Sequence, residues 1–386
     1  AAGAAHAACN GNKGTTITGR VYSPSGDLPL WGATVYVPSG TVDPLPTGAS
    51  CFRCDAPLPG SPVALSKTDA TGYFEIVNAP AGELVPLIIQ AGRWRRQIQL
   101  QRVLECQENE VAESETRLPR NRSEGNVPRM AVATGGEDTL ECTLRKLGVD
   151  DSEFTTDLSD QRVRLFAGLG GSAKLAGSAG SSFADASLLW STLESLAAYD
   201  MVLLASETDQ NIPAKGAPAL QALRDYAAAG GRVLLQHHQG YFVQAGPSDL
   251  AGVASFEPKP DLPQPFEAKI DAATPRGQAF AAWLAHIEPT GSPGALVLRM
   301  GQNTLKAVND PAVRLIYGES PTTVQAFSVD LASGAAERGC GRVTFTDILS
   351  ASGDAVADFP DGCETTTWKP QELALAFLIF DLGYCL

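Results

Sequence analysis

The chain has 386 residues, 44% of them hydrophobic and 19% charged, which is enough apolar surface for packed cores and excludes wholesale disorder. Its length favours two domains over one. With 29 basic and 43 acidic residues the formal net charge is −14, which argues against duplex nucleic acid and anionic membrane surfaces as partners.

The N-terminal stretch predicts an exported protein. Small residues fill Ala1–Ala8, as expected after removal of a signal peptide, and residues 1–13 are expected to be flexible. Cys9 lacks the leucine expected three residues before a lipidated cysteine, so a lipoprotein is not favoured. The longest apolar run, Leu373–Phe380, is too short to cross a bilayer. We therefore expect a secreted or cell-surface protein without a membrane span.

The eight cysteines favour disulfide bonds in an oxidising compartment. They are Cys9, Cys51, Cys54, Cys106, Cys142, Cys340, Cys363 and Cys385. The alternative for Cys51-x-x-Cys54 is metal or redox chemistry, but no second pair lies nearby and the surrounding loop is rich in proline and glycine. Four cysteines precede residue 128 and four follow it, so we expect two bridges in each domain, with the connectivity left open.

Residues 14–106 are expected to form a β-sandwich. Short segments of strand-forming residues alternate with turns that contain glycine, proline and aspartate. The expected strands are 17–22, 33–37, 66–68, 73–77, 84–90 and 97–103. The turn Asp69–Gly72 joins two of them, and we expect Val35 and Phe74 to point into the core.

This region resembles the carboxypeptidase regulatory-like, transthyretin-type sandwich. The matching motifs are Gly19-x-Val21, Gly32-Ala33-x-Val35, Thr68-Asp69-Ala70-x-Gly72-x-Phe74 and Pro80-x-Gly82. The resemblance implies an accessory or adhesive module rather than a catalytic one. Residues 107–128, with acidic side chains followed by basic ones, are expected to form a linker, either solvated or bridging the two domains.

Residues 129–386 change to an alternation of strands and helices. The expected strands are 130–134, 162–166, 200–205, 233–235 and 341–347, and the expected helices are 138–147, 188–199, 217–229 and 370–382. Uninterrupted apolar strands between helices predict a parallel sheet covered on both faces. Residues 241–335 are less regular and predict a β-rich elaboration with a helix at 276–286 and strands at 295–300, 313–317 and 323–331.

The second domain resembles the class I glutamine amidotransferase-like fold, which is flavodoxin-like, and among its members the trehalose-utilisation-like proteins. The matching motifs are Tyr199-Asp200-x-Val202-x-Leu204, Leu220-x-x-Leu223-x-x-Tyr226-x-x-x-Gly230-Gly231-Arg232-Val233 and Gly341-Arg342-Val343. Further motifs are Gly92-Arg93-Trp94-Arg95-Arg96, Leu118-Pro119-Arg120-Asn121, Gly135-Gly136-Glu137-Asp138-x-x-Glu141-Cys142 and Phe380-Asp381-Leu382. With these motifs the whole chain also resembles uncharacterised secreted myxobacterial proteins that carry a carboxypeptidase regulatory-like domain. An amidotransferase would place a nucleophilic cysteine after the strand 232–235, where this chain has Gln236-His237-His238, so that chemistry is not expected here.

Ligands of open α/β sheets bind beyond the carboxyl ends of the strands. Candidate catalytic residues at these ends are His237, His238, Glu137, Asp138 and Ser206, and candidate ligand-binding residues are Gly135, Gly136, Glu207 and Asp209. One histidine is a candidate general base or metal ligand, and a Ser206–His237–Glu137 triad is a further arrangement. Two adjacent histidines in a strand would face opposite sides and would not share a metal, so no metal and no cofactor are expected. A satisfied structural histidine is the competing interpretation.

Two further patterns are weaker. Trp94 and Arg95 belong to a basic–aromatic cluster that would bind an acidic partner or a glycan. The alternative is that this segment is an edge strand whose charges keep it soluble. Gly168–Ser172 is a glycine-rich segment that we expect to be a surface loop rather than a phosphate cradle.

The sequence leaves two functional hypotheses. The first is a non-catalytic structural or interaction protein whose partner is another copy, an extracellular protein or a glycan; the strand 323–331 would add to a neighbour's sheet and build a fibre. The second is a secreted carbohydrate-directed enzyme or sugar-binding protein that uses the His237/Glu137 cleft.

Overall fold

The structure is a computed structural model that describes residues 9, 14–177, 181–257, 259–289, 291–292, 294–332, 339–350, 352–364 and 366–385. The segment predicted to be flexible, residues 1–13, lies outside the described residues except for Cys9 and is therefore not assessed. The chain forms two compact units: Ala1–Leu45 with Asp55–Val127, and Pro46–Cys54 with Pro128–Leu386.

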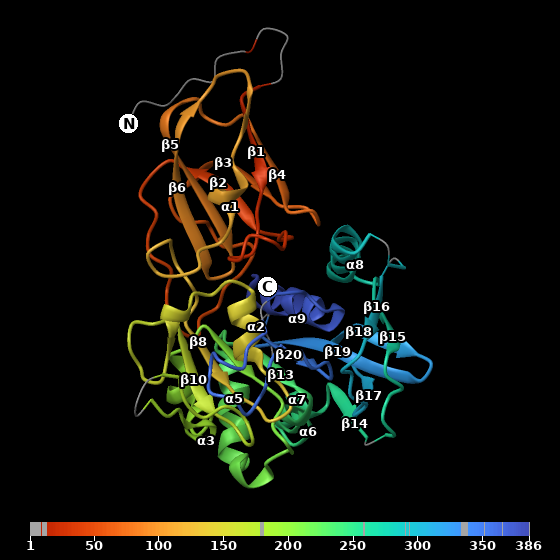
Figure 1. Cartoon of the computed structure of the whole chain (residues 1–386). Helices are drawn as coiled ribbons and strands as arrows, with labels where there is room; N and C mark the ends of the chain where they lie inside the picture. The colour runs from red at the N-terminus through yellow and green to blue at the C-terminus, as the bar shows by residue number, and fades with distance from the viewer. Residues whose placement is uncertain are drawn as a thin grey trace. The chain divides into compact units, whose positions relative to one another are not determined.

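The first unit is a β-sandwich, as predicted. One sheet pairs β1 (Thr16–Arg20) with β4 (Tyr73–Val77) and β7 (Glu108–Glu110), and the other has the order β3 (Pro62–Lys67), β2 (Thr34–Pro38), β5 (Gly82–Ala91) and β6 (Trp94–Val103) (Figure 1). Val35 and Phe74 are buried in the core, as their alternation predicts. In the β3–β4 turn the Asp69 carboxylate accepts hydrogen bonds from the backbone N–H groups of Thr71 and Tyr73.

The segment expected to be a linker, residues 107–128, is instead part of the first unit. Its strand β7 pairs in parallel with β1, and the short helix α1 (Glu113–Thr116) follows. Within this segment Glu124 accepts hydrogen bonds from both Arg117 and Arg120. The Arg117 guanidinium, with Arg120, holds the pKa of the Glu124 carboxyl well below its usual range. A segment that is polar and irregular in sequence therefore folds because its charges pair locally.

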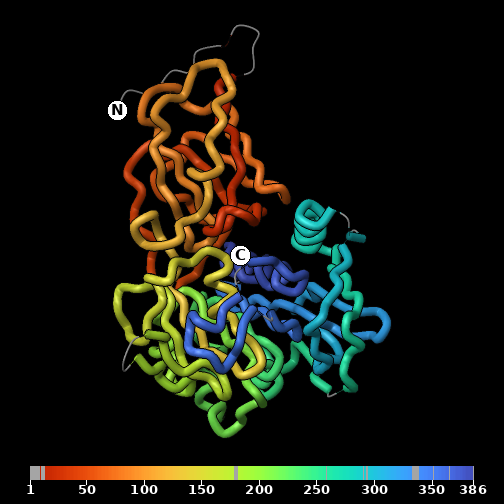
Figure 2. Tube along the Cα trace, viewed as in Figure 1, coloured from red at the N-terminus to blue at the C-terminus, as the bar shows by residue number. Residues whose placement is uncertain are grey.

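The second unit is built on a large mixed sheet whose first half is parallel. The parallel strands run in the order β11 (Ala184–Asp185), β10 (Val163–Ala167), β8 (Met130–Ala133), β12 (Met201–Leu204), β13 (Arg232–Gln236) and β20 (Gly341–Thr346). The short strand β9 (Phe154–Thr155) also pairs with β10. In Figure 2 the blue trace of β20 lies beside the green trace of β13, although about a hundred residues separate them in the chain. The predicted parallel α/β sheet is thus confirmed.

Beyond β20 the sheet continues with antiparallel strands, which form the predicted elaboration. They follow in the order β19 (Thr322–Leu331), β18 (Val313–Glu319), β15 (Phe266–Ile270) and β16 (Ala295–Leu298) (Figure 1). A separate ribbon pairs β14 (Ala254–Phe256) with β17 (Leu305–Val308). Because β19 is paired on one side with β20 and on the other with β18, it has no free edge. The expectation that strand 323–331 adds to a neighbour's sheet is therefore wrong for this fold.

Helices cover the second unit's sheet. They are α2 (Leu140–Lys146), α3 (Ala186–Leu189), α4 (Leu193–Ala197), α5 (Ala217–Ala228), α6 (Tyr241–Gln244), α7 (Ser248–Ala251), α8 (Pro275–Ile287) and α9 (Pro370–Gly383). The helix expected over 188–199 is divided into α3 and α4, because Thr192 accepts the Ser195 backbone N–H and caps a new helix. On α2, Lys146 forms a buried ion pair with Glu372 of α9 at 2.6 Å.

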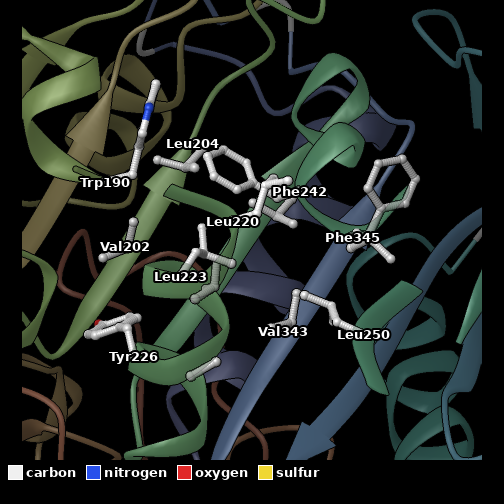
Figure 3. Close-up of a cluster of buried hydrophobic side chains, with 14 of the residues drawn as sticks. Trp190, Val202, Leu204, Leu220, Leu223, Tyr226, Phe242, Leu250, Val343 and Phe345 are labelled. Atoms are coloured by element: carbon white, nitrogen blue, oxygen red, sulfur yellow. The ribbon is translucent and has the colours of Figure 1, made fainter. Parts of the chain in front are cut away.

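A buried apolar cluster fixes α5 on the sheet. Figure 3 shows Leu223 of α5 among the side chains of the neighbouring strands, including Val202 of β12 and Val343 of β20. The alternate strand residues Leu203 and Leu234 are also fully buried, and they point to the opposite face. Burial on both faces explains why these strands read as continuous apolar runs in the sequence.

All eight cysteines form disulfide bonds, as predicted, but they do not divide evenly between the units. The pairs are Cys9–Cys106, Cys51–Cys340, Cys54–Cys385 and Cys142–Cys363. The expectation of two bridges in each domain is wrong, because the Pro46–Cys54 segment belongs to the second unit. In that segment Gly48 N–H and Ala49 N–H donate to Asp200 and to the Ala197 carbonyl. The cysteines of Cys51-x-x-Cys54 have separate partners and do not form a redox pair with each other.

The Leu223 side chain gives a direct test of this core. Leu223→Ala should lower the free energy of unfolding by about 2–5 kcal/mol, because the cavity removes packing contacts with both strands. The exposed Leu188→Ala should change it by less than about 0.5 kcal/mol. Urea unfolding followed by circular dichroism measures both variants, and equal losses would contradict the packing described here.

Candidate functional site

Four parallel strands deliver polar side chains to one edge of the second unit's sheet. Glu137 follows β8, Ser206 follows β12, His237 follows β13 and Asp347 follows β20. The strands are paired in register, so their carboxyl ends lie together. This is the edge where open α/β sheets bind ligands.

The His237 ring forms a hydrogen bond with the buried carboxylate of Asp347. Its Nδ1 lies 3.0 Å from Oδ1 of Asp347, whose side chain is fully buried and also accepts hydrogen bonds from the Thr304 backbone N–H and hydroxyl. With the Nδ1 hydrogen directed at Asp347, Nε2 is the ring nitrogen that faces Glu137, at 3.8 Å from Oε2. The imidazole is thereby fixed in orientation and in tautomer.

His237 has an unusual backbone. Its φ is +38°, in the left-handed region that non-glycine residues rarely adopt. The strand β13 ends at Gln236, and His237 opens a short 3₁₀ turn, His237–Gly240. Strained backbone at a strand end is retained when the surrounding structure imposes it, and it is concentrated at functional sites.

The turn brings the two histidines together. Their ring centroids lie 4.0 Å apart, and His238 Nε2 is 3.6 Å from Oε1 of Glu137. The expectation that the adjacent histidines face opposite sides of a strand is therefore wrong, because the strand stops before His237. The donor atoms of Glu137, His237 and His238 all lie within 4.8 Å of one another, a spacing that can hold a metal ion.

Glu137 occupies the centre of this group. Burial raises the pKa of its carboxyl, but interactions with His238, Ser206 and His237 outweigh burial, so the net shift is downward. The Ser206 hydroxyl donates to Oε2 of Glu137 at 2.9 Å. The carboxylate thus lies between the serine and His237, which is not the order of a Ser–His–acid triad. The predicted Ser206–His237–Glu137 triad is accordingly not formed, although its three residues are brought together.

A pocket of about 600 Å³ opens beside the histidines. Its lining comes from the 209–213 loop, the β13 turn, α6 and the β14/β17 ribbon: Asp209, Gln210, Asn211, Ile212, Pro213, His237, His238, Gly240, Gln244, Phe256, Glu257 and Thr304. The volume lies in the range of small-molecule sites. Among the predicted residues, Asp209 joins the histidines in this lining.

Glu207 supports the pocket wall and does not face it, contrary to its prediction as a ligand-binding residue. Its buried carboxylate lies 2.5 Å from the Lys215 Nζ and accepts hydrogen bonds from Leu169 N–H and Asn211 Nδ2. Lys215 Nζ also donates to the Gln210 carbonyl at 2.7 Å. Burial lowers the pKa of Lys215, while Glu207 favours its charged form. The ion pair therefore anchors both ends of the loop that lines the pocket.

Gly135 and Gly136 lie at close backbone contacts, and neither belongs to the lining of the pocket described above. A Cβ on Gly135 would lie 2.0 Å from the Ser206 carbonyl oxygen, and one on Gly136 would lie 2.3 Å from Thr208 Cγ2. Gly136 N–H donates to the Leu169 carbonyl, so the Gly168–Ser172 segment contacts this turn, while Leu169 and Gly170 are exposed as expected for a surface loop. Close backbone approach at these glycines is what sets the position of Glu137.

Asp138 is structural, in contrast to its predicted catalytic role. It is fully buried and accepts hydrogen bonds from Gln236 Nε2, the Thr139 backbone and both the backbone and hydroxyl of Ser350. Its neighbour Glu141, on α2, is also buried, and burial raises the pKa of Glu141 to about 8. Asp138 thus joins the ends of β8 and β13 to the Ser350 segment, and neither acid belongs to the pocket lining.

Trp94 and Arg95 lie in the first unit and do not form an exposed gripping surface. Trp94 is only 2% exposed, because it opens β6 and packs into the core. Arg95 pairs through its backbone with Asn126, and its guanidinium donates to the Asp43 carbonyl. The charged edge-strand alternative agrees with the position of β6 at the end of its sheet.

Sequence reasoning missed Asp347, Thr304, Phe256 and Glu257. Asp347 is the last residue of the predicted strand 341–347, so the strand-end rule applied to β20 would have found it. Thr304, Phe256 and Glu257 flank or belong to the β14/β17 ribbon, which carries no periodic signal in the sequence. Cys142, on α2, forms a disulfide bond with Cys363.

The buried Lys215–Glu207 pair gives one test of the pocket's support. Lys215→Met should lower the free energy of unfolding by about 3–5 kcal/mol, because Glu207 is left as an uncompensated buried charge. Lys269→Met is the matched control: its ion pair with Glu319 has the same 2.5 Å distance but is exposed, so stability should hardly change. Equal effects in chemical denaturation would contradict the support role of Lys215.

Glu141 gives a pH-dependent test. The folded chain keeps Glu141 protonated up to about pH 8, whereas an unfolded glutamate ionises near 4.5. Between these values the unfolded state binds fewer protons, so the contribution to the free energy of unfolding falls with rising pH, by up to about 1.4 kcal/mol per unit.

The Glu141→Gln variant lacks this pH dependence. The difference between its free energy of unfolding and that of the unsubstituted chain should therefore increase from pH 5 to pH 8. Denaturation at both pH values measures it, with the exposed Glu194→Gln as the control. A difference that stays constant with pH would show that Glu141 is already ionised in the folded protein.

Comparisons with known proteins give fold likenesses only. No family profile matches the sequence, and no curated protein sequence matches it. A ThuA-like protein from Bacteroides uniformis is 12% identical with a TM-score of 0.34, over 65% of this chain and 89% of that one.

Two other solved structures are similar over part of the chain. The N-terminal domain of mmIFT52 is 12% identical with a TM-score of 0.37, over 66% of this chain and 96% of that one. A cohesin–X-dockerin complex from Acetivibrio cellulolyticus is 17% identical with a TM-score of 0.18, over 38% of this chain and 78% of that one. At these identities and scores the likenesses assign neither a family nor an activity.

Proposed function

We propose that the second unit binds a neutral, hydroxyl-rich small molecule, a carbohydrate, in the pocket beside Glu137, His237 and His238. The observation that carries the proposal is that His237 and His238, whose ligand atoms converge with that of Glu137, line a pocket of about 600 Å³. A pocket of this size has room for a mono- or disaccharide.

The chemistry of the lining supports this ligand class. Amide, carboxylate and hydroxyl groups of Asn211, Gln244, Glu257 and Thr304 offer donors and acceptors for sugar hydroxyls. The apolar Phe256 lies among them and suits the C–H face of a sugar ring.

Charge argues against an anionic ligand. The described lining contains the carboxylates of Asp209 and Glu257 and no lysine or arginine. A phosphate or carboxylate ligand would meet like charge without a cationic partner. A neutral polyol avoids this cost.

Four disulfide bonds indicate folding in an oxidising compartment, and we extend this to secretion or display at the cell surface. Among the described helices, none is long and apolar enough to cross a membrane. In this proposal the first unit is a carboxypeptidase regulatory-like module, and the second an amidotransferase-like domain that has exchanged the nucleophile position for histidine. Binding is proposed in preference to hydrolysis, because the arrangement of Ser206, Glu137 and His237 is not that of a nucleophilic triad.

Assembly into fibres remains a second candidate, supported by the missing nucleophile. Strand 323–331 cannot provide the contact between copies, because β19 is already paired on both sides. A homo-oligomer or a glycan partner is compatible with sugar binding, and light scattering on the purified chain distinguishes a monomer from an assembly.

The test is a binding screen of neutral mono- and disaccharides, trehalose included, by calorimetry on the full chain. His238→Ala and Asn211→Ala should each weaken binding roughly 5- to 30-fold, because each removes about 1–2 kcal/mol of polar contact. His286→Ala is the control, since His286 is exposed on α8, outside the pocket lining. No sugar response in the unsubstituted chain, or equal weakening by His286→Ala, would overturn the proposal.

A further inference from the structure

The structure assigns to Glu137, His237 and His238 a second property: together they form a binding site for one divalent transition-metal ion, with Zn²⁺ as the best match. This inference deepens the proposed function and rests on it only for the role of the ion, which would present an open coordination position to the sugar in the pocket.

The distances between donor atoms fit a metal site. Ligand atoms about 2.0–2.1 Å from a tetrahedral Zn²⁺ lie roughly 3.3 Å from one another. Here Oε2 of Glu137 is 3.8 Å from His237 Nε2, and Oε1 is 3.6 Å from His238 Nε2. The ligand atoms of all three residues lie within 4.8 Å of one another, so movements of at most about 1.5 Å between them would bring the three side chains into coordination distance.

The distances to Glu137 are too long for good hydrogen bonds. At 3.6 and 3.8 Å the histidine nitrogens fall outside the usual N–H···O range of 2.7–3.2 Å. The three side chains therefore surround one point without forming short hydrogen bonds with one another. An ion at that point would satisfy them all.

The side chains that hydrogen-bond to Glu137 and His237 are arranged as the side chains around the ligands of a metal site are. A ligating histidine donates its other N–H to a carboxylate, which sets the tautomer and makes the ring a better ligand. His237 does this through Nδ1 to Asp347, whose position is fixed by two hydrogen bonds from Thr304. Glu137 in turn accepts a hydrogen bond from Ser206.

The types of ligand atom and the oxidising compartment both favour Zn²⁺ over other ions. Two imidazoles and one carboxylate suit transition metals and disfavour Ca²⁺ and Mg²⁺, which prefer oxygen ligands only. Zn²⁺ has no redox chemistry and is suited to the oxidising compartment that the four disulfides indicate. With three protein ligands, one position of a tetrahedral ion stays open, and both histidines also line the pocket.

The experiment is a titration of the full chain, first dialysed against a chelator, with Zn²⁺ and, separately, with Co²⁺ as a spectroscopic probe. We expect one equivalent to bind, with visible Co²⁺ absorption of a low-coordinate nitrogen–oxygen site and a higher Tm in Zn²⁺. His238→Ala and Glu137→Gln should each weaken Zn²⁺ binding at least 100-fold. Asp347→Asn, which acts through His237, should weaken it 10- to 100-fold.

Control variants separate this site from adventitious binding. His286→Ala and Glu194→Gln, both exposed and outside the pocket lining, should leave Zn²⁺ affinity unchanged, and circular dichroism of each variant without metal verifies its fold. Failure of the unsubstituted chain to bind Zn²⁺ or Co²⁺ at micromolar concentration would overturn the metal site, as would affinity unchanged in His238→Ala.

Sugar calorimetry in the presence of chelator keeps the two proposals apart. Sugar binding by a chain that binds no Zn²⁺ would overturn the metal site and leave the proposed function standing. Zn²⁺ binding through Glu137 and His238 without any sugar response would support the metal site and contradict the carbohydrate proposal.

Discussion

The parallel pairing of β8, β12, β13 and β20 is the constraint on which the candidate site depends. In-register parallel strands end at one edge, so residues separated by up to 210 positions, Glu137 and Asp347, meet there through their shared contacts with His237. The apolar faces of these strands fix their register, because a one-residue slip would turn buried side chains towards water or towards the wrong layer. The site is thus a consequence of core packing, and its geometry is as well determined as the sheet itself.

Around this edge, buried polar groups are paired with specific partners. Lys215 with Glu207, Lys146 with Glu372, and Asp138 with Ser350 each bind a loop or helix to the sheet. Such pairs contribute little net stability compared with apolar residues, but breaking one leaves a costly buried charge or polar group. Their effect is to make one arrangement of the loops much better than its alternatives. This rigidity allows His237 to hold a positive φ and to face Glu137.

Much of the architecture follows from the sequence, because burial on both faces makes β12 and β13 continuous apolar runs and gives α5 a helical apolar stripe. The strand-end rule also leads to Glu137, His237 and His238. What it cannot give is ring orientation: the sequence does not show that β13 stops before His237, and this decides whether the two histidines diverge or meet. The β14/β17 ribbon and the placement of Pro46–Cys54 depend on long-range contacts and disulfide pairing, which leave no local pattern.

The central claim is that Glu137, His237 and His238 converge on one ligand at the edge of the sheet. The most direct measurement is a crystal structure of the full chain grown with Zn²⁺, with anomalous data collected on both sides of the zinc absorption edge. The account predicts an edge-dependent anomalous peak bonded to Nε2 of both histidines and to the Glu137 carboxylate, with Asp347 still on His237 Nδ1. No peak at this position, together with histidine rings that point apart, would contradict it.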